Sequence, residues 1–156
     1  MSNVPAPSLD PKHLDHLRDS GLTDDTIARA GLCSVRDPGL AAQILGWKGT
    51  GPAPALCIPY TSFGGEVVMY ILRPDTPHPR SDGSMPKYES PIEQPPRIYV
   101  PPPSLVDPGV WLDPTVPLLL TEGVKKALAA VQAGAKALSS QGVFVWHDIA
   151  HREHSG

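Results

Sequence analysis

The sequence has 156 residues, enough for one domain that buries roughly two thirds of the surface of its unfolded chain. Its 13 basic and 16 acidic residues give a formal net charge of −3, so no overall field draws the chain to nucleic acid and any such contact must be local. No apolar run approaches the ~18 residues that a membrane span needs, and the N-terminus lacks the apolar core of a signal peptide. We therefore expect a cytoplasmic protein that does not enter a membrane.

The cysteine and proline content limits the kinds of metal site, disulfide and loop that the chain can form. Cys33 and Cys57 lie far apart in the sequence and have no CxxC partner, which argues against a zinc site or a disulfide framework. We interpret both as small buried hydrophobic residues. The chain holds 20 prolines, where an average chain of this length would have about eight. Long irregular connections are therefore expected.

Three short helices are predicted in an N-terminal helical segment, residues 1–48. Each has apolar residues at helical spacing, and the first two end at a glycine, the usual C-terminal stop. A cap residue, Thr23 or Asp37, precedes the second and the third. The predicted helices are Pro11–Ser20, Asp24–Ala30 and Pro38–Trp47.

The next segment, residues 49–114, predicts an antiparallel β-hairpin with Pro-rich loops. Two runs of β-forming residues, 55–60 and 66–73, are separated by a turn that contains two glycines. Residues 74–97 hold seven prolines and several charges, which predicts a long surface loop. A short strand is expected at 98–100.

The last segment, residues 115–156, begins a β-α-β unit. Val116–Thr121 is a continuous apolar run, as expected of a strand buried on both faces. The amphipathic run 124–133 predicts a helix, and 135–139 and 143–146 predict one or two further strands. Because a β-α-β unit places its strands in parallel, the chain is predicted to be an α/β protein with an incomplete parallel sheet.

Glu122 is the main candidate for a functional residue. It follows the apolar strand and precedes a helix, which places its carboxylate in the crevice where open α/β sheets bind ligands. Gly123 lets a phosphate or another backbone approach closely. Lys125 and Lys126 lie in the first helical turn, where free N–H groups already favour anions, so at least one is expected to reach a phosphate. The alternative is that Glu122 only caps the helix.

These residues resemble a known family. The string PLLLTEGVKKALAAVQAG is similar to the strand-Glu-Gly-helix opening of the Toprim domain of primases and topoisomerases. The pieces SGLTDDTIARAGL, ALCIPY, ILRPD, KYESP and IYVPP follow one another as in the DUF3854 family of phage and plasmid primase-like proteins. The resemblance covers most of the chain and implies that its last sheet is an incomplete Toprim-like sheet.

The resemblance implies that Glu122 is the general acid or base of a Mg²⁺-dependent nucleotidyl transfer. The chain would then be the N-terminal part of a primase-like DNA replication protein. Family members hold Mg²⁺ with an Asp-x-Asp pair on a later strand, and this sequence has none. Because one glutamate does not form a cage of hard oxygen ligands, Glu122 would be a weak metal ligand and the chain alone is expected to be inactive. The alternative is a non-catalytic replication accessory or remnant that binds nucleic acid or phosphate weakly.

Arg73, Lys87 and Tyr88 are further candidates for a nucleotide or template surface. Arginine binds phosphate with both arms of its guanidinium group, and tyrosine can stack on a base. The alternative is ordinary surface contact in a Pro-rich loop. The expected partners are DNA or nucleotides, and a replication protein such as a helicase. Because a Toprim sheet has more strands than these residues supply, we also expect an exposed apolar edge and self-association.

A different pattern occurs near the C-terminus. His147, His151 and His154 stand at positions i, i+4 and i+7, so on a helix they would share one face and could bind Zn²⁺ or a similar ion. The alternative is a frayed hydrophilic terminus, because no cap or apolar stripe holds this segment helical.

Overall fold

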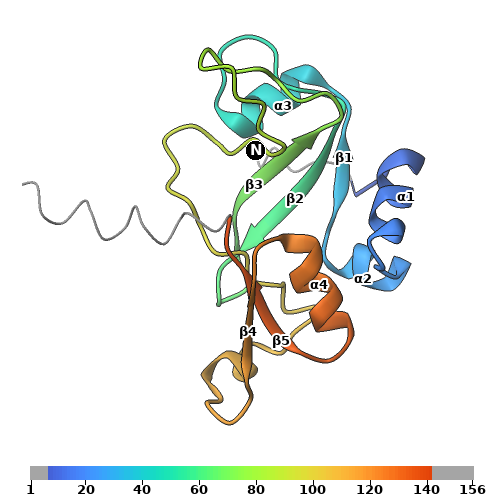
Figure 1. The fold of residues 1–156 in the computed structure, drawn as a ribbon, viewed down its shortest axis with the longest axis vertical. Helices are drawn as coiled ribbons and strands as arrows, with labels where there is room; N and C mark the ends of the chain where they lie inside the picture. The colour runs from blue at the N-terminus through green and yellow to red at the C-terminus, as the bar shows by residue number, and fades with distance from the viewer. Residues whose placement is uncertain (1–6, 142–156) are drawn as a thin grey trace, which may run out of the picture.

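The computed structural model describes residues 7–141, which form two small sheets flanked by helices (Figure 1). The predicted strand at 143–146 and the three C-terminal histidines lie outside these residues. In the described part, no helix is both long and apolar enough to cross a membrane. The elements in chain order are α1 (Pro11–Asp19), α2 (Asp24–Arg29), β1 (Cys33–Val35), α3 (Pro38–Leu45), β2 (Ala55–Thr61), β3 (Val67–Pro74), the 3-10 helix η1 (Pro108–Leu112), β4 (Leu118–Thr121), α4 (Val124–Gln132) and β5 (Lys136–Ser139).

The three N-terminal helices confirm the prediction, and their caps act as the sequence indicates. The Thr23 hydroxyl accepts a hydrogen bond from the Thr26 amide, and the Asp37 carboxylate accepts one from the Gly39 amide. Gln132 at the end of α4 fastens α4 to the α1–α2 turn, since its side-chain oxygen lies 2.8 Å from the Thr23 amide nitrogen and its nitrogen 2.9 Å from the Gly21 carbonyl. The N-terminal helices are therefore tied to the last helix.

The antiparallel sheet has the order β1-β2-β3. The β2–β3 hairpin confirms the prediction, whereas β1 was not predicted because three residues show no periodicity. In the β1–β2 pair Cys33 stands opposite Cys57, and both thiols are free and buried, as their interpretation as hydrophobic residues requires. Since β1 belongs to the segment 1–48, the structure joins the first two predicted segments in one sheet, and the division into three segments stays a prediction.

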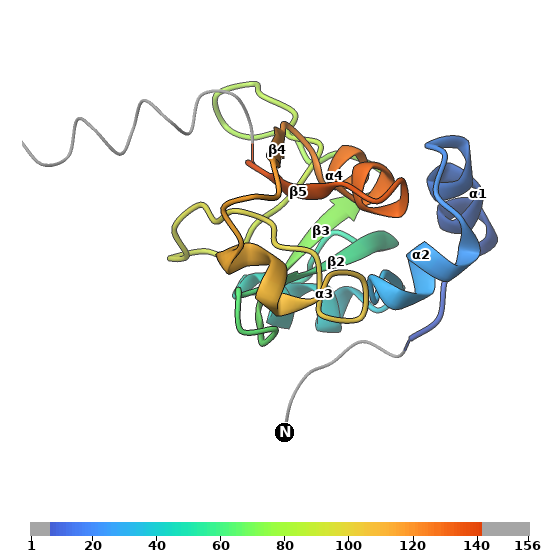
Figure 2. The same cartoon turned by 90° about the horizontal axis from the view of Figure 1, so that it is seen from below.

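Both faces of the antiparallel sheet are covered. Leu56 and Ile58 of β2 pack on one face with residues of α1, α2 and α4, while Cys57 and Leu72 pack on the other with α3. Figure 2 shows α3 and α4 on opposite sides of β2 and β3. The cluster with α1, α2 and α4 also includes Ala137 of β5, so it forms a core that both sheets share.

The predicted β-α-β unit is confirmed: β4 and β5 pair in parallel, from Leu118 opposite Lys136 to Thr121 opposite Ser139. The prediction that the first strand is buried on both faces is wrong. Leu118, Leu119 and Leu120 are 53, 47 and 42% exposed. The reason is that β4 has a neighbour on one edge within the described residues, and that neighbour, β5, takes most of the contact with α4.

The predicted strand at 98–100 is reduced to a two-residue link between the sheets. Val100 bridges to Thr61 at the end of β2, and Tyr99 bridges to Ser139 at the end of β5. The ring of Tyr99 is fully buried and lies edge-on to the ring of Tyr60, with 5.2 Å between centroids. This link holds the end of β5 beside the end of β2.

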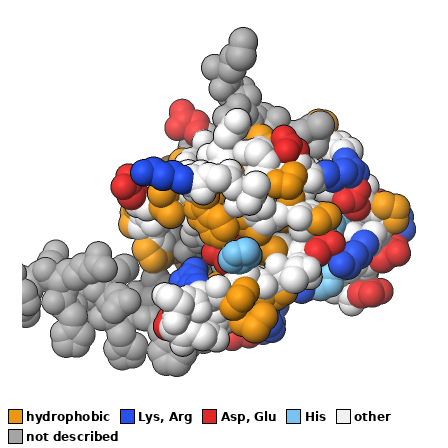
Figure 3. Space-filling view, turned by 90° about the horizontal axis from the view of Figure 1, so that it is seen from above, with side chains coloured by type: hydrophobic (Ala, Val, Ile, Leu, Met, Phe, Trp, Pro, Cys, Tyr) orange, Lys and Arg blue, Asp and Glu red, His pale blue; other side chains and the backbone are white. Residues whose placement is uncertain are grey.

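The predicted long loop, residues 74–97, is mostly exposed and irregular, but one residue anchors it. Glu89 is buried and exchanges two backbone hydrogen bonds with Leu72 of β3, of 2.7 and 3.0 Å. Its carboxylate also lies 3.4 Å from Arg80. This anchor holds Lys87 and Tyr88, which precede it in sequence, close to β3. Seen from above, the surface carries basic and acidic side chains interspersed with hydrophobic ones, without a large area of one sign (Figure 3).

Candidate functional site

Glu122 lies directly after β4 and directly before α4, as predicted. Gly123 is the N-cap of α4, and nothing lies within 4 Å of the place where a Cβ would stand. The Thr121 hydroxyl lies within hydrogen-bond distance of the carbonyls of Gly123 and Leu138, at 3.1 and 3.2 Å, which fixes the turn to β5. The turn therefore leaves an open approach to the backbone beside the Glu122 carboxylate.

The Glu122 carboxylate is exposed and forms an ion pair with Lys126, one helical turn further along α4. The hydrogen bond from Lys126 lowers the pKa of Glu122 below its usual value. The two side chains are 56 and 65% exposed, so solvent screens the pair and it adds little stability. A general acid at neutral pH needs a raised pKa. Glu122 is therefore ionised at neutral pH, the form that can accept a proton or bind a cation.

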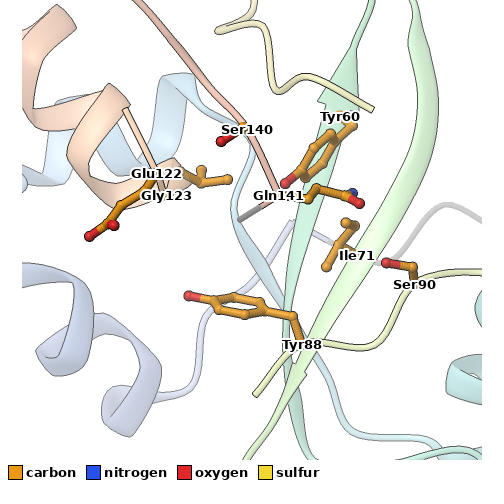
Figure 4. A pocket seen from close by; sticks show the side chains of 9 residues that line it. Tyr60, Ile71, Tyr88, Ser90, Glu122, Gly123, Ser140 and Gln141 are labelled. Carbon is orange, nitrogen blue, oxygen red and sulfur yellow. The ribbon is translucent and has the colours of Figure 1, made fainter. Parts of the chain in front are cut away.

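A cavity of about 200 Å³ lies beside this turn. Figure 4 shows Glu122 at its rim with the carboxylate pointing outward, and Tyr88 reaching toward Glu122 from the opposite wall. Burial raises the pKa of Tyr60, deeper in the cavity, to about 12, so that hydroxyl stays protonated at neutral pH. The lining residues are Tyr60, Ile71, Tyr88, Ser90, Glu122, Gly123, Val124, Ser140 and Gln141.

A second cavity, of about 250 Å³, is basic. Its lining residues are Lys12, His13, His16, Arg73, Pro74, Asp75, Pro77 and Lys87. Lys125 of α4 contacts one of these residues, since its ammonium nitrogen lies 2.9 Å from Nε2 of His16. Residues from α1, β3, the long loop and α4 thus bring their positive charges together.

The charges of this basic cavity repel one another. Within residues 7–141, Arg73, Lys87 and Lys125 have no acidic side chain within ion-pair distance. Partial burial lowers the pKa of Lys125, and the charges of Arg73 and Lys87 lower it further. An anion that enters this cluster lowers its electrostatic free energy, so the cluster favours anion binding.

The single carboxylate of the basic cavity is already engaged. Asp75 accepts hydrogen bonds from Nε2 of His13 at 2.7 Å and from Lys12 at 2.9 Å. Burial alone would raise the pKa of Asp75, but these two hydrogen bonds outweigh it and lower the pKa. Nδ1 of the buried His13 lies 2.7 Å from the Ser34 hydroxyl, which also accepts the Asp10 amide at 2.8 Å. This chain of contacts ties the start of α1 to β1 and to the residue after β3, and it occupies both oxygens of Asp75.

The two cavities adjoin. Lys87 lines the basic cavity and its neighbour Tyr88 lines the other, while β3 contributes Arg73 to the first and Ile71 to the second. The turn into α4 lies between them, since Glu122 lines one cavity and Lys125 contacts His16, which lines the other. An aromatic ring, an exposed carboxylate and a group of cations therefore share one side of the molecule.

The structure brings together several of the predicted site residues. Arg73 and Lys87 line the basic cavity and Lys125 lies beside it, near enough for their charges to lower its pKa, whereas Lys126 pairs with Glu122. Sequence reasoning missed His16, although its spacing of three from His13 on a predicted helix was a signal that both share a face. The catalytic role of Glu122 and the roles of the other predicted residues stay predictions.

The residues near Glu122 do not form a magnesium site by themselves. Among residues 7–141, no three His, Cys, Asp or Glu side chains are grouped so that they could hold a metal ion. Mg²⁺ needs several oxygen ligands in octahedral geometry, and the Glu122 carboxylate is paired with Lys126. Any Mg²⁺ site would need oxygen ligands from beyond the described residues.

Three solved structures with a similar fold are DnaG primase cores. The structure of the DnaG catalytic core matches with a TM-score of 0.53 and 19% identity, over 85% of this chain and 47% of that chain. The DnaG primase catalytic domain bound to ssDNA matches with a TM-score of 0.54 and 17% identity, over 85% and 49%. The E. coli primase catalytic core matches with a TM-score of 0.52 and 19% identity, over 84% and 49%. The fold is that of part of the DnaG catalytic core.

This chain spans about half the length of those DnaG cores. The model of the family described as domain of unknown function DUF3854 matches residues 109–155, which confirms the resemblance to that family, although the upstream pieces that suggested it lie outside the matched range. The matched range includes Glu122, Gly123, Lys125 and Lys126. No curated protein matches the chain.

Proposed function

We propose that this chain is part of a primase-like nucleotidyltransferase of DNA replication in a phage or plasmid, and that its basic cavity binds phosphate groups of DNA or nucleotides. One observation carries the proposal: Arg73, Lys87 and Lys125, distant in sequence, meet without an acidic partner in the described part of the chain. Their charge is what phosphate-dominated binding needs. The likeness of the fold to primase cores, one of them bound to ssDNA, points the same way.

The two cavities suggest how a nucleotide or a single strand would lie. Phosphates would sit among the cations of the basic cavity, and a base would stack on the exposed ring of Tyr88. Glu122 would then face the sugar-phosphate as a base or as one ligand of Mg²⁺. The remaining metal ligands would come from elsewhere in the full assembly.

The proposed binding is tested with a fluorescein-labelled thymidine oligonucleotide and the 156-residue chain. Replacing Arg73 and Lys87 together by glutamine is expected to weaken binding at low salt, because two phosphate contacts are lost. The slope of log K against log salt should also become shallower by about 0.7 per contact removed, the value for single strands. Fluorescence anisotropy over a series of salt concentrations measures both quantities.

Lys48→Gln is the matched control, since Lys48 lines neither cavity and makes no hydrogen bond or ion pair with other described residues. It should leave both affinity and slope unchanged. An oligonucleotide that fails to bind the unaltered chain, or binding that responds equally to Lys48→Gln and to the double change, contradicts the proposal.

A primer-synthesis assay separates the enzyme from the alternative, a non-catalytic accessory or remnant. With single-stranded DNA, nucleotides and Mg²⁺, the isolated chain is expected to make no product, because a lone carboxylate does not hold the metal. Product that disappears in Glu122→Gln would show that the chain completes its metal site. Oligonucleotide binding without any product from a longer form that carries further carboxylates would favour the accessory.

A further inference from the structure

We propose that His16 makes the basic cavity a proton-linked phosphate site: binding of a polyanion is accompanied by protonation of His16, which then donates a hydrogen bond to a phosphate. The inference rests on the proposed function, because it assumes that the basic cavity binds phosphate. The inference adds to the proposed function a role for His16 of α1 and a prediction of how the affinity for phosphate depends on pH.

The geometry around His16 sets the state of its ring in the free chain. The ammonium nitrogen of Lys125 lies 2.9 Å from Nε2 of His16. A lysine ammonium group has only donors, so Nε2 must accept this hydrogen bond. A ring that accepts at Nε2 is neutral and carries its proton on Nδ1. The free chain therefore holds His16 as the neutral partner of a cation.

The groups that face His16 are mostly cationic, from every element packed around it. They are His13 and Asp19 on α1, Arg73 on β3, Lys125 on α4, and Lys12, Lys87 and Asp75 on the walls of the same cavity. Asp19 opposes this trend, and Asp75 is engaged by His13 and Lys12. Partial burial lowers the pKa of His16, and the charges of Arg73 and Lys125 lower it further.

A bound phosphate reverses the balance. Its negative charge offsets Arg73 and Lys125 and offers an acceptor to His16, so the pKa of His16 rises on binding. A ligand that raises a pKa binds more tightly when the group can be protonated. Affinity must therefore increase as pH falls from about 8 to about 6, and a shift of one pKa unit corresponds to a tenfold effect. We expect an increase of about three- to tenfold, lost when position 16 cannot titrate.

The experiment measures the affinity of the chain for a thymidine oligonucleotide by isothermal titration calorimetry between about pH 6 and pH 8. The oligonucleotide carries no fluorescein label and ends in a 5′-hydroxyl group. Its phosphodiesters and thymines do not titrate in this range, so the pH dependence belongs to the protein. His16→Gln should bind with an affinity that no longer rises toward low pH. His16→Arg, a permanent cation, should bind tightly at both pH values. His78→Gln is the matched control, because His78 packs on Trp47 and lines neither cavity, and it should keep the full dependence.

The outcomes separate the two proposals. If the unaltered chain does not bind at any pH, the proposed function fails. If it binds but His16→Gln keeps the same rise toward low pH, another group carries the proton and the present inference fails alone. His16→Arg tests the same idea independently should His16→Gln fold poorly, since a pH-dependent His16→Arg variant also contradicts it. Circular dichroism of each variant confirms that the fold is retained.

Discussion

The antiparallel sheet and the parallel sheet show what an apolar run becomes when its neighbours differ. All seven residues of β2 are buried, because β1 and β3 cover its edges and helices cover both faces of the sheet. The leucines of β4 are as apolar as the residues of β2, yet each is more than two fifths exposed. The two strands differ in the number of elements that pack against them, and not in the hydrophobicity of their own residues. The described parallel sheet is therefore the less complete part of the molecule, although it carries Glu122.

The site crosses this boundary. Arg73 and Tyr88 belong to the complete sheet and the loop anchored on it, while Glu122 and Lys125 belong to the incomplete one. A phosphate held by Arg73 and Lys125 would bridge the two regions. Ligand binding should then oppose any opening that separates the two regions, because such an opening releases the ligand.

A pair of matched leucine changes tests the comparison with the largest expected effect. Leu72→Ala in β3 removes a fully buried side chain and should lower the free energy of unfolding by about 2–5 kcal/mol. Leu119→Ala in β4, where the side chain is 47% exposed, should change it by no more than about 0.5 kcal/mol. Urea denaturation at a concentration where the chain is monomeric measures both. Equal losses would mean that β4 is covered within the monomer.

The contacts of His13 test how firmly α1 is held to the antiparallel sheet. His13→Ala should cost about 1–3 kcal/mol, because it removes a buried hydrogen-bond partner from the Ser34 hydroxyl, which keeps only the Asp10 amide, and from the Asp75 carboxylate, which keeps only Lys12. His78→Ala, which removes an imidazole ring packed on Trp47 at the surface, should cost less. Thermal unfolding of the two variants decides whether the His13 chain is structural.

Asp75 gives the antiparallel sheet a pH dependence. Burial raises its pKa, but the hydrogen bonds from His13 and Lys12 more than offset this, so the pKa in the folded state lies below that of the unfolded chain. The resulting stability is present above the unfolded value of about 3.9 and is lost as pH falls through the folded value. The effect should be about 1 kcal/mol. Asp75→Asn, compared with the unaltered chain from about pH 7 down to pH 2, should lack this loss. An identical acid profile would contradict the assignment.

The exposed leucines of β4 also test whether this strand, unlike β2, is a surface on which two copies of the chain associate. An uncovered apolar strand with a free edge favours association, and we propose that the chain self-associates through β4. Leu119→Lys should therefore shift the chain toward monomer in sedimentation velocity while leaving the unfolding curve of the monomer, measured at high dilution, nearly unchanged. A monomeric unaltered chain at all concentrations would rule out this surface as a contact.

The elements that sequence predicts well here are those whose signals are local. Thr23 and Asp37 cap the helices that they were expected to cap, and the strand-Glu-Gly-helix string gives the turn at Glu122. What escapes prediction depends on tertiary neighbours. β1 is too short for a period, and the exposure of β4 depends on strands elsewhere in space. The meeting of His16 with Lys125, 109 positions apart, leaves no trace in either segment.

The facing cysteines of β1 and β2 allow the opening of the antiparallel sheet to be measured by thiol labelling. They are the only two thiols in the chain, both are buried, and both belong to the antiparallel sheet. A thiol-reactive dye can modify them only when that sheet opens, so the rate of labelling reports the opening of this region and is silent about fluctuations confined to β4 and β5. Labelling kinetics with and without an oligonucleotide would therefore show whether a ligand held at the boundary slows the motion of the sheet that is already complete.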